Sequence, residues 1–185
     1  MIFRFNIAKT IQASAVLLKA EPARRMGRLR LLKLLYIADR ETLAERARPI
    51  TGDRPVAMDN GPVVSRIYDL IREEPAPGTD SIWRHYISAP ENWDVRLIKE
   101  PETSELSPAE EGLIDEVYAR HGSMNRWDLV RLSHELPEWQ DPDGSVIPIQ
   151  YADILRAANR TDAEIAAVEA ELESLAAAEA MLQPA

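Results

Sequence analysis

Apolar residues recur at helical spacing in the first part of the chain. The first such stretch, residues 7–20, carries one apolar face formed by Ile7, Ile11, Ala15 and Leu18. Asn6 is a suitable N-cap for this helix, and Pro22 ends it. A second helix is predicted over 31–47, because its leucines and alanines also follow a 3–4 spacing. A third is predicted to begin at Pro62, since proline is favoured at the first helical position, and to end near Ile71.

The second part of the chain carries clear helix-start signals. Residues 107–110 form a capping box, which predicts a helix from Pro108 to about Arg120. Ser123 or Asn125 caps another helix that ends near His134. A turn at 141–144 is followed by a short helix over 149–158. A second capping box at 161–164 begins a terminal helix whose apolar seam is Ile165, Val168, Leu172, Leu175 and Leu182.

Two short stretches instead show an alternation of apolar and polar residues, which is typical of strands. Residues 81–88 and 93–99 place apolar and polar side chains at period two, which predicts an antiparallel hairpin turning at about 89–92. Residues 73–80 predict a surface loop. The expected fold class is therefore α+β and predominantly α-helical, with a small antiparallel hairpin or sheet and a long C-terminal helix.

The expected organisation is one compact domain over 1–160, followed by an acidic amphipathic helix over 161–185. That helix has six acidic residues and no basic residue. We expect it to pack on its own domain, to contact a partner, or to exchange between copies of the chain.

Composition narrows the classes of protein. The 185 residues include no cysteine, so disulfides and thiolate metal sites are excluded. The chain has no apolar run near the ~20 residues that span a bilayer, which predicts a cytoplasmic protein.

The net charge of −9 hides an asymmetry. Residues 1–72 hold 14 basic and 7 acidic side chains, whereas the remainder holds 8 and 24. Such a split suits self-complementary packing or a charged partner, and internal pairing is the alternative.

The segment before the second helix is rich in basic residues. Arg24, Arg25, Arg28, Arg30 and Lys33 are candidates for an anion patch. The indication for nucleic acid is weak, because the chain is acidic and no aromatic residues interleave with these side chains. A solvated helix face or an acidic protein partner are the other interpretations.

No recognised catalytic motif is present. The chain lacks the glycine-rich phosphate loops, the nucleophile elbow and the HExxH motif. His134-Glu135-Leu136-Pro137-Glu138 resembles a metal-binding helix, but Pro137 breaks the register that brings its ends together. We therefore predict no cofactor, no metal and no enzyme, although an acid–base site assembled from Asp39, Asp53 and His134 stays open.

Several separated motifs carry a family resemblance. The runs KLLYIADRE, RPITGD, VAMDNGPVVSRIYDLI, LSPAEEGLIDEVY and LSHELPEW occur in order between about residues 30 and 140. In this order they resemble the Panacea domain of SocA-like antitoxins from bacterial toxin–antitoxin pairs. Val64 departs from the pattern, because relatives carry a second proline after GPV.

The resemblance implies an antitoxin that binds a cognate protein toxin, usually encoded beside it. The alternatives are an adaptor that delivers the toxin to a protease, and a DNA-binding autoregulator. We expect no membrane partner, and nucleic acid stays a lesser possibility. The expected partner-binding residues are Asp39, Arg40, Arg48, Asp53, Arg54, Met58 and Trp139. An internal ion-pair network is the alternative role for the charged members. The expected structural residues are Tyr36, Gly52, Gly61, Pro62, Tyr68 and His134.

Overall fold

A computed structural model describes residues 1, 3–72, 80–102 and 105–182 of the chain. Its helices are α1 (Ile7–Lys19), α2 (Arg28–Arg46), α3 (Ser65–Arg72), α4 (Asp80–Tyr86), α5 (Pro108–His121), α6 (Arg126–His134), α7 (Tyr151–Ala157) and α8 (Asp162–Leu182). Two small antiparallel sheets accompany them, so the predicted α+β, predominantly helical class is confirmed.

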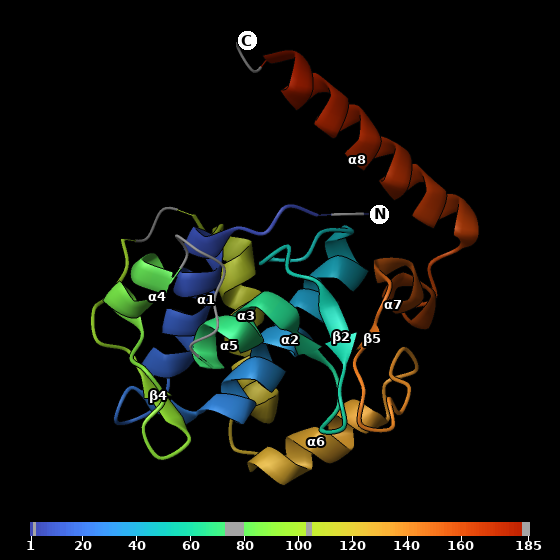
Figure 1. Ribbon diagram of the computed structural model, residues 1–185. Coiled ribbons are helices and arrows are strands. Elements are labelled where there is room, and N and C mark those ends of the chain that lie inside the picture. Colours follow the sequence, from blue (N-terminus) through green and yellow to red (C-terminus); the bar gives the residue numbers. More distant parts are fainter. Residues whose placement is uncertain (2, 73–79, 103–104, 183–185) are drawn as a thin grey trace.

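Helix α2 is the centre of the domain (Figure 1). It contacts α1, α5, α6 and α7. An unbroken run from Leu31 to Asp39 is buried, so the helix has no solvent-facing stripe over two turns. A helix that is covered all round needs a nearly continuous apolar sequence, and LLKLLYIA supplies it with one exception, Lys33.

The sheets join segments that lie far apart in sequence. Strand β1 (Arg25–Gly27) pairs with β4 (Asp94–Arg96). In the second sheet β2 (Pro55–Ala57) lies between β3 (Val63–Val64) and β5 (Ile147–Pro148). The second sheet therefore ties the connector between α2 and α3 to the segment before α7.

The predicted strand over 81–88 is wrong, because this segment forms α4. Trp83 and Ile87 are both fully buried, and their separation of four residues is a helical spacing that the surrounding alternation concealed. Of the hairpin, a turn and two isolated bridges form, Ile87 with Leu97 and Glu91 with Asp94, while β4 pairs with β1 instead. The expected loop over 73–80 lies outside the described residues except at Asp80, where α4 begins.

The predicted start of the third helix at Pro62 is also wrong. Val63 and Val64 form β3, in keeping with the strand preference of β-branched residues, and α3 begins at Ser65. The carboxylate of Asp53 accepts hydrogen bonds from the backbone N–H of Arg66 and Ile67. This distant side chain therefore caps α3, and local sequence gives no sign of it.

The predicted caps are confirmed. Asn6 caps α1, Asn125 caps α6, and both capping boxes form, at Ser107 with Glu110 and at Thr161 with Glu164. Among the described residues, none of these helices has the length and apolar character required to cross a membrane.

Helix α8 projects from the body of the domain (Figure 1). Ile165 is its buried apolar anchor beside α7. Two ion pairs hold its first half: Glu169 with the N-terminal ammonium at 3.3 Å and Glu171 with Arg48 at 2.7 Å. The helix is therefore fixed to its own domain at its base, while its remaining length extends outward.

Candidate partner-binding site

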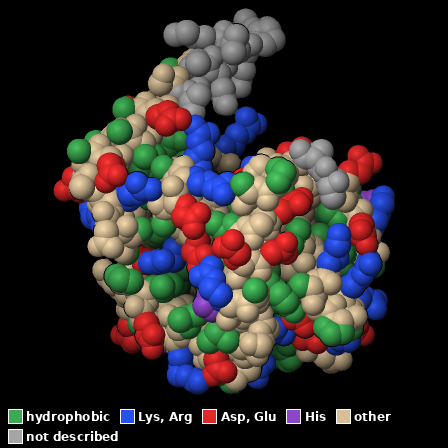
Figure 2. All heavy atoms as spheres, turned by 180° about the vertical axis from the view of Figure 1, so that it is seen from behind, with side chains coloured by type: hydrophobic (Ala, Val, Ile, Leu, Met, Phe, Trp, Pro, Cys, Tyr) green, Lys and Arg blue, Asp and Glu red, His purple; other side chains and the backbone are tan. Residues whose placement is uncertain are grey.

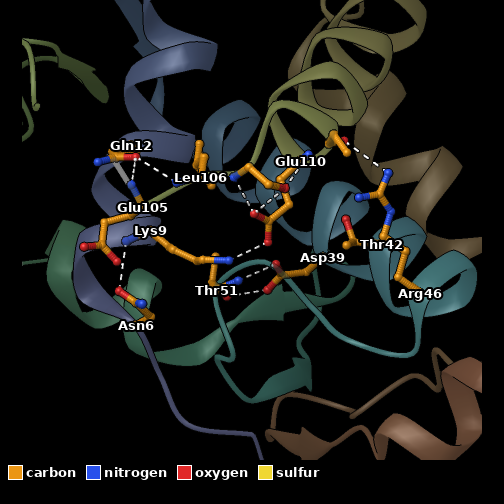
Figure 3. A network of polar contacts seen from close by, with 12 residues as sticks. Asn6, Lys9, Gln12, Asp39, Thr42, Arg46, Thr51, Glu105, Leu106 and Glu110 are labelled. Carbon is orange, nitrogen blue, oxygen red and sulfur yellow. Dashed lines mark hydrogen bonds and ion pairs between the residues drawn. The ribbon is translucent and has the colours of Figure 1, made fainter. Parts of the chain in front are cut away.

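The connector between α2 and α3 is held by buried carboxylates. Asp39 accepts the backbone N–H of Thr51 at 2.9 Å and also the Thr51 hydroxyl (Figure 3). Burial raises the pKa of Asp39 to about 7, although the hydrogen bonds from Thr51 oppose this shift. Asp53 is fully buried and accepts three backbone N–H groups; burial raises its pKa too, against those hydrogen bonds.

Gly61 lets the connector lie directly against α2 and α6. Its φ is +84°, and a Cβ built there would lie 2.3 Å from Ser133 Oγ and 2.7 Å from Lys33 Nζ. Lys33 is fully buried and donates to the carbonyl of Pro62 at 2.8 Å. Burial lowers the pKa of Lys33 to about 7. Lys33 is therefore an interior residue, and its inclusion in the anion patch was wrong.

His134 and Trp139 cover the outer side of this turn. Their rings are stacked, with centroids 4.0 Å apart. His134 Nε2 lies 3.1 Å from the carbonyl oxygen of Asp59, and Trp139 Nε1 donates to the carbonyl of Met58 at 3.2 Å. Among the described residues, no hydrogen bond links His134 to Asp39 or Asp53, the two carboxylates with which it was considered as an acid–base site.

Glu138 joins the same region to α2. Its side chain is fully buried and accepts from Tyr36 Oη at 2.9 Å, from Arg40 Nε at 2.6 Å and from Arg40 Nη2 at 3.2 Å. Burial, together with the charge of Glu138, raises the pKa of Tyr36. Tyr36 is thus a core residue with one satisfied polar atom.

The expected partner-binding residues do not share one environment. Asp39 and Asp53 are buried, Arg40 is paired with Glu138, and Arg48 is exposed and paired with α8. Arg54 is exposed, while Met58 and Trp139 are half-buried. Their role in binding stays a prediction, and for the two aspartates the contacts in the structure are internal.

A broad concavity lies elsewhere, at the N-terminal end of α2. We call it the arginine–tryptophan groove. It has a volume of about 990 Å³ and is lined by residues of β1, the start of α2, the turn before β4 and the start of α6, with Tyr68 and Asn60 at one side. Its lining includes Arg25, Arg28, Arg30 and Arg126, but Asp94 is its one acidic residue.

Two exposed tryptophans stand at this groove. Trp93 is 64% exposed and Trp127 is 51% exposed. The guanidinium of Arg28 lies 4.3 Å from the Trp93 ring centroid, and that of Arg126 lies 5.0 Å from the Trp127 centroid. Aromatic residues therefore do accompany the arginines, contrary to the sequence-based expectation, because the β1–β4 pairing brings Trp93 beside them.

Trp93 is held in a strained backbone conformation. Glu91 and Asp94 exchange backbone hydrogen bonds of 2.8 and 3.1 Å around a two-residue turn, and Asn92 and Trp93 have φ of 51° and 73°. Asn-Gly is the favoured pair for such a turn, and a bulky residue with positive φ is a genuine outlier. Strain of about 1–3 kcal/mol at such positions is typical of functional sites.

Charged side chains elsewhere are largely paired across the sequence. Lys9 pairs with Glu110 (Figure 3), Arg24 with Glu100, and Arg120 with Glu41. On the face opposite to the view of Figure 1, acidic and basic side chains are intermingled (Figure 2). Internal pairing therefore accounts for much of the charge asymmetry, and the groove keeps a local excess of arginine.

The described residues hold no group of three or more His, Cys, Asp or Glu side chains placed to bind a metal ion. The fold defines a predominantly helical α+β domain with an arginine-rich groove at the N-terminal end of α2. The model of the family described as Antitoxin SocA-like, Panacea domain, matches residues 31–140, which is more than half of the chain. The chain belongs to this family, and membership supports an antitoxin role.

No curated protein and no solved structure matches the chain.

Proposed function

We propose that this protein neutralises a cognate protein toxin, encoded by a neighbouring gene, by binding it directly through the arginine–tryptophan groove. The observation that carries the proposal is the pair of exposed tryptophans, each stacked with an arginine at this groove. Tryptophan, tyrosine and arginine are the side chains that dominate the energetics of protein interfaces.

The arginines differ in their freedom to bind a partner. Arg25 is paired with Asp94 at 2.8 Å, and Arg30 with Glu21 at 2.8 Å. Arg28 and Arg126 make no ion pair with any described residue. A carboxylate on the toxin can therefore pair with Arg28 or Arg126 without displacing an existing partner, so we expect an acidic contact surface on the toxin.

Stoichiometric neutralisation requires a tight complex. A nanomolar Kd corresponds to about −12 kcal/mol, typically over roughly 1,600 Å² of total buried surface. The groove supplies a central cluster of anchors for such an interface. Its neighbours Tyr68, Met124 and Asn60 extend the contact surface.

The first test is co-expression with the product of the adjacent gene. We expect the two proteins to co-purify, growth to be restored, and the amount of toxin to stay constant when growth is restored. A toxic neighbour that neither binds nor is neutralised contradicts the proposal. A toxin that disappears in a protease-dependent manner supports the adaptor mechanism instead.

A second test addresses nucleic acid, because a basic groove with exposed aromatic rings also suits stacked bases. Under the proposal, operator DNA and single-stranded RNA bind weakly, and the wild-type protein binds them no more tightly than the Trp93→Ala/Trp127→Ala variant does. Tight, salt-sensitive binding that the variant loses favours the autoregulator instead.

A further inference from the structure

We propose that the arginine–tryptophan groove also binds helix α8 of a second copy of this chain. The inference uses the same groove as the proposed function, but it does not require that a toxin binds there. It joins two surfaces of one polypeptide that carry opposite charge and that do not contact each other within the chain.

The first surface is α8. Between 161 and 185 the chain has six acidic residues and no basic residue. Its apolar residues follow a 3–4 spacing. Of those whose side chains are described, Ile165 is buried, whereas Val168 and Leu172 are half-buried. Val168 and Leu172 therefore keep part of their surface exposed, and an acidic amphipathic helix of this kind can bind in a groove of a partner.

The second surface is the groove. Trp93, Trp127 and Met124 offer apolar surface, while Arg28 and Arg126 offer guanidinium groups that are free of ion pairs with the described residues. In the proposed complex Val168 and Leu172 of α8 pack against the tryptophans, and Glu173, which is exposed and outside the ion pairs at the base of α8, pairs with Arg28 or Arg126. Pairing of α8 with a second α8 is disfavoured, because it brings two acidic helices together.

The chain's own α8 cannot reach the groove. Arg160 donates to the carbonyls of Ala44 and Glu45 at 2.9 and 3.1 Å, which fixes the base of α8 at the C-terminal end of α2. The groove lies at the other end of α2, a helix of 19 residues and therefore about 28 Å long. Since α8 points away from the body (Figure 1), its partner groove belongs to another molecule.

A contact between two different surfaces is heterologous, so it closes into a reciprocal pair or a ring, or it continues as a chain. If the groove also binds the toxin, self-association and toxin binding exclude each other. Under the proposed function, the self-associated antitoxin is then inactive until the toxin competes for the groove and dissociates it.

The test is a charge exchange in the full-length protein, followed by sedimentation velocity over a wide concentration range. One variant carries Arg28→Glu and Arg126→Glu. Both residues are the first of their helices, where a negative side chain is favourable, so folding is preserved. The other carries Glu173→Lys, which is exposed on α8 and outside the ion pairs that hold its base.

We expect wild-type protein to self-associate and each variant alone to do so at least about tenfold more weakly, which corresponds to about 1.4 kcal/mol. A mixture of the two variants restores association, because the lysine helix then meets the glutamate groove. The control Arg4→Glu/Arg46→Glu makes the same change in net charge as the groove variant at two exposed positions outside the groove, and it keeps wild-type behaviour.

Three results overturn the inference: a wild-type protein that stays monomeric throughout, self-association that neither variant weakens, or a mixture that stays as weak as its components. The α8 variant also separates the two proposals. The α8 variant is expected to neutralise the toxin as well as wild type does. If neither wild type nor this variant neutralises the toxin, the result counts against the proposed function and leaves the self-association proposal unaffected.

Discussion

At the scale of single residues, Trp93 has both a strained backbone conformation and an exposed side chain. A glycine at this position relieves the positive φ and completes the favoured Asn-Gly turn, so Trp93→Gly is expected to stabilise the fold by about 1 kcal/mol. The same change removes an anchor and weakens toxin binding. Chemical denaturation and a binding titration measure the two effects. If the Trp93→Gly variant is less stable than wild type and binds the toxin normally, Trp93 is not kept in this strained conformation for toxin binding.

Gly61 gives a prediction about close packing. Gly61→Ala adds a methyl group that overlaps Ser133 and Lys33 in a left-handed conformation, so we expect a loss of at least about 2 kcal/mol in unfolding free energy. Gly144→Ala is the matched control, because its φ is +77° but no atom lies within 4 Å of the new Cβ. Equal losses at both positions exclude the overlap as the cause.

Lys33 gives a prediction about pH. Its pKa is lowered from 10.5 to about 7, so between these pH values the unfolded chain holds the additional proton and stability rises with pH. The buried Lys33 therefore costs no stability through its charge above pH 10.5, where it is neutral in both states. The cost grows as the pH falls and is complete once the pH has reached about 7. Asp39, whose pKa is raised to about 7, acts in the opposite direction below that pH.

Urea unfolding between pH 7 and 9 tests this behaviour. Wild-type protein is expected to become more stable over this range, while Lys33→Met shows little change with pH. A wild-type curve that is as flat as that of the variant shows that Lys33 is not held in the interior. The charge of Lys33 hid its burial in the sequence, because lysine is almost never fully buried.

At the scale of elements, the segment after α6 is joined to α2 by Glu138. Glu138→Gln leaves Arg40 without its partner in a mostly buried site, and we expect a loss of roughly 3 kcal/mol in unfolding free energy. Asp153→Asn removes an ion pair with Arg156 that is screened by solvent, and it is expected to leave the unfolding free energy close to that of wild type. Similar values for the two variants in thermal or urea unfolding contradict the structural role of Glu138.

The same scale shows how far the sequence predicts the fold. Helix starts with local caps, such as those at Asn6, Ser107 and Thr161, were predicted correctly, because the signal and the helix lie within four residues. The start of α3 was not, because its cap is Asp53, 13 residues away from Arg66. Strands β1 and β5 escaped prediction, since two or three residues give no measurable alternation.

The candidate site depends on these unpredicted contacts. The family motifs in the sequence indicate the connector and the helix before it, where Gly61 has a positive φ and Tyr36 is buried. The groove was missed because β1–β4 pairing and the fold of α6 bring Trp93 and Trp127 to arginines more than 60 residues earlier in the chain. Burial of Asp39 and Asp53 likewise depends on tertiary structure.

At the scale of the whole molecule, α2 separates the two surfaces that matter. Its N-terminal end carries the arginine–tryptophan groove, and its C-terminal end carries the base of α8. The buried network around the connector holds the elements that line the groove, because α3 and α6 both contact it. The groove proposed to bind the partner is therefore positioned by this buried polar network.

The most direct measurement is the Kd of the purified complex with the neighbour-encoded toxin. Trp93→Ala/Trp127→Ala is expected to weaken binding by roughly 100-fold or more, since each hot-spot side chain contributes about 2 kcal/mol. Ile98→Ala/Val146→Ala removes two equally exposed apolar side chains outside the groove and keeps the wild-type Kd. A folded tryptophan variant that binds within about twofold of wild type contradicts the groove as the toxin-binding site.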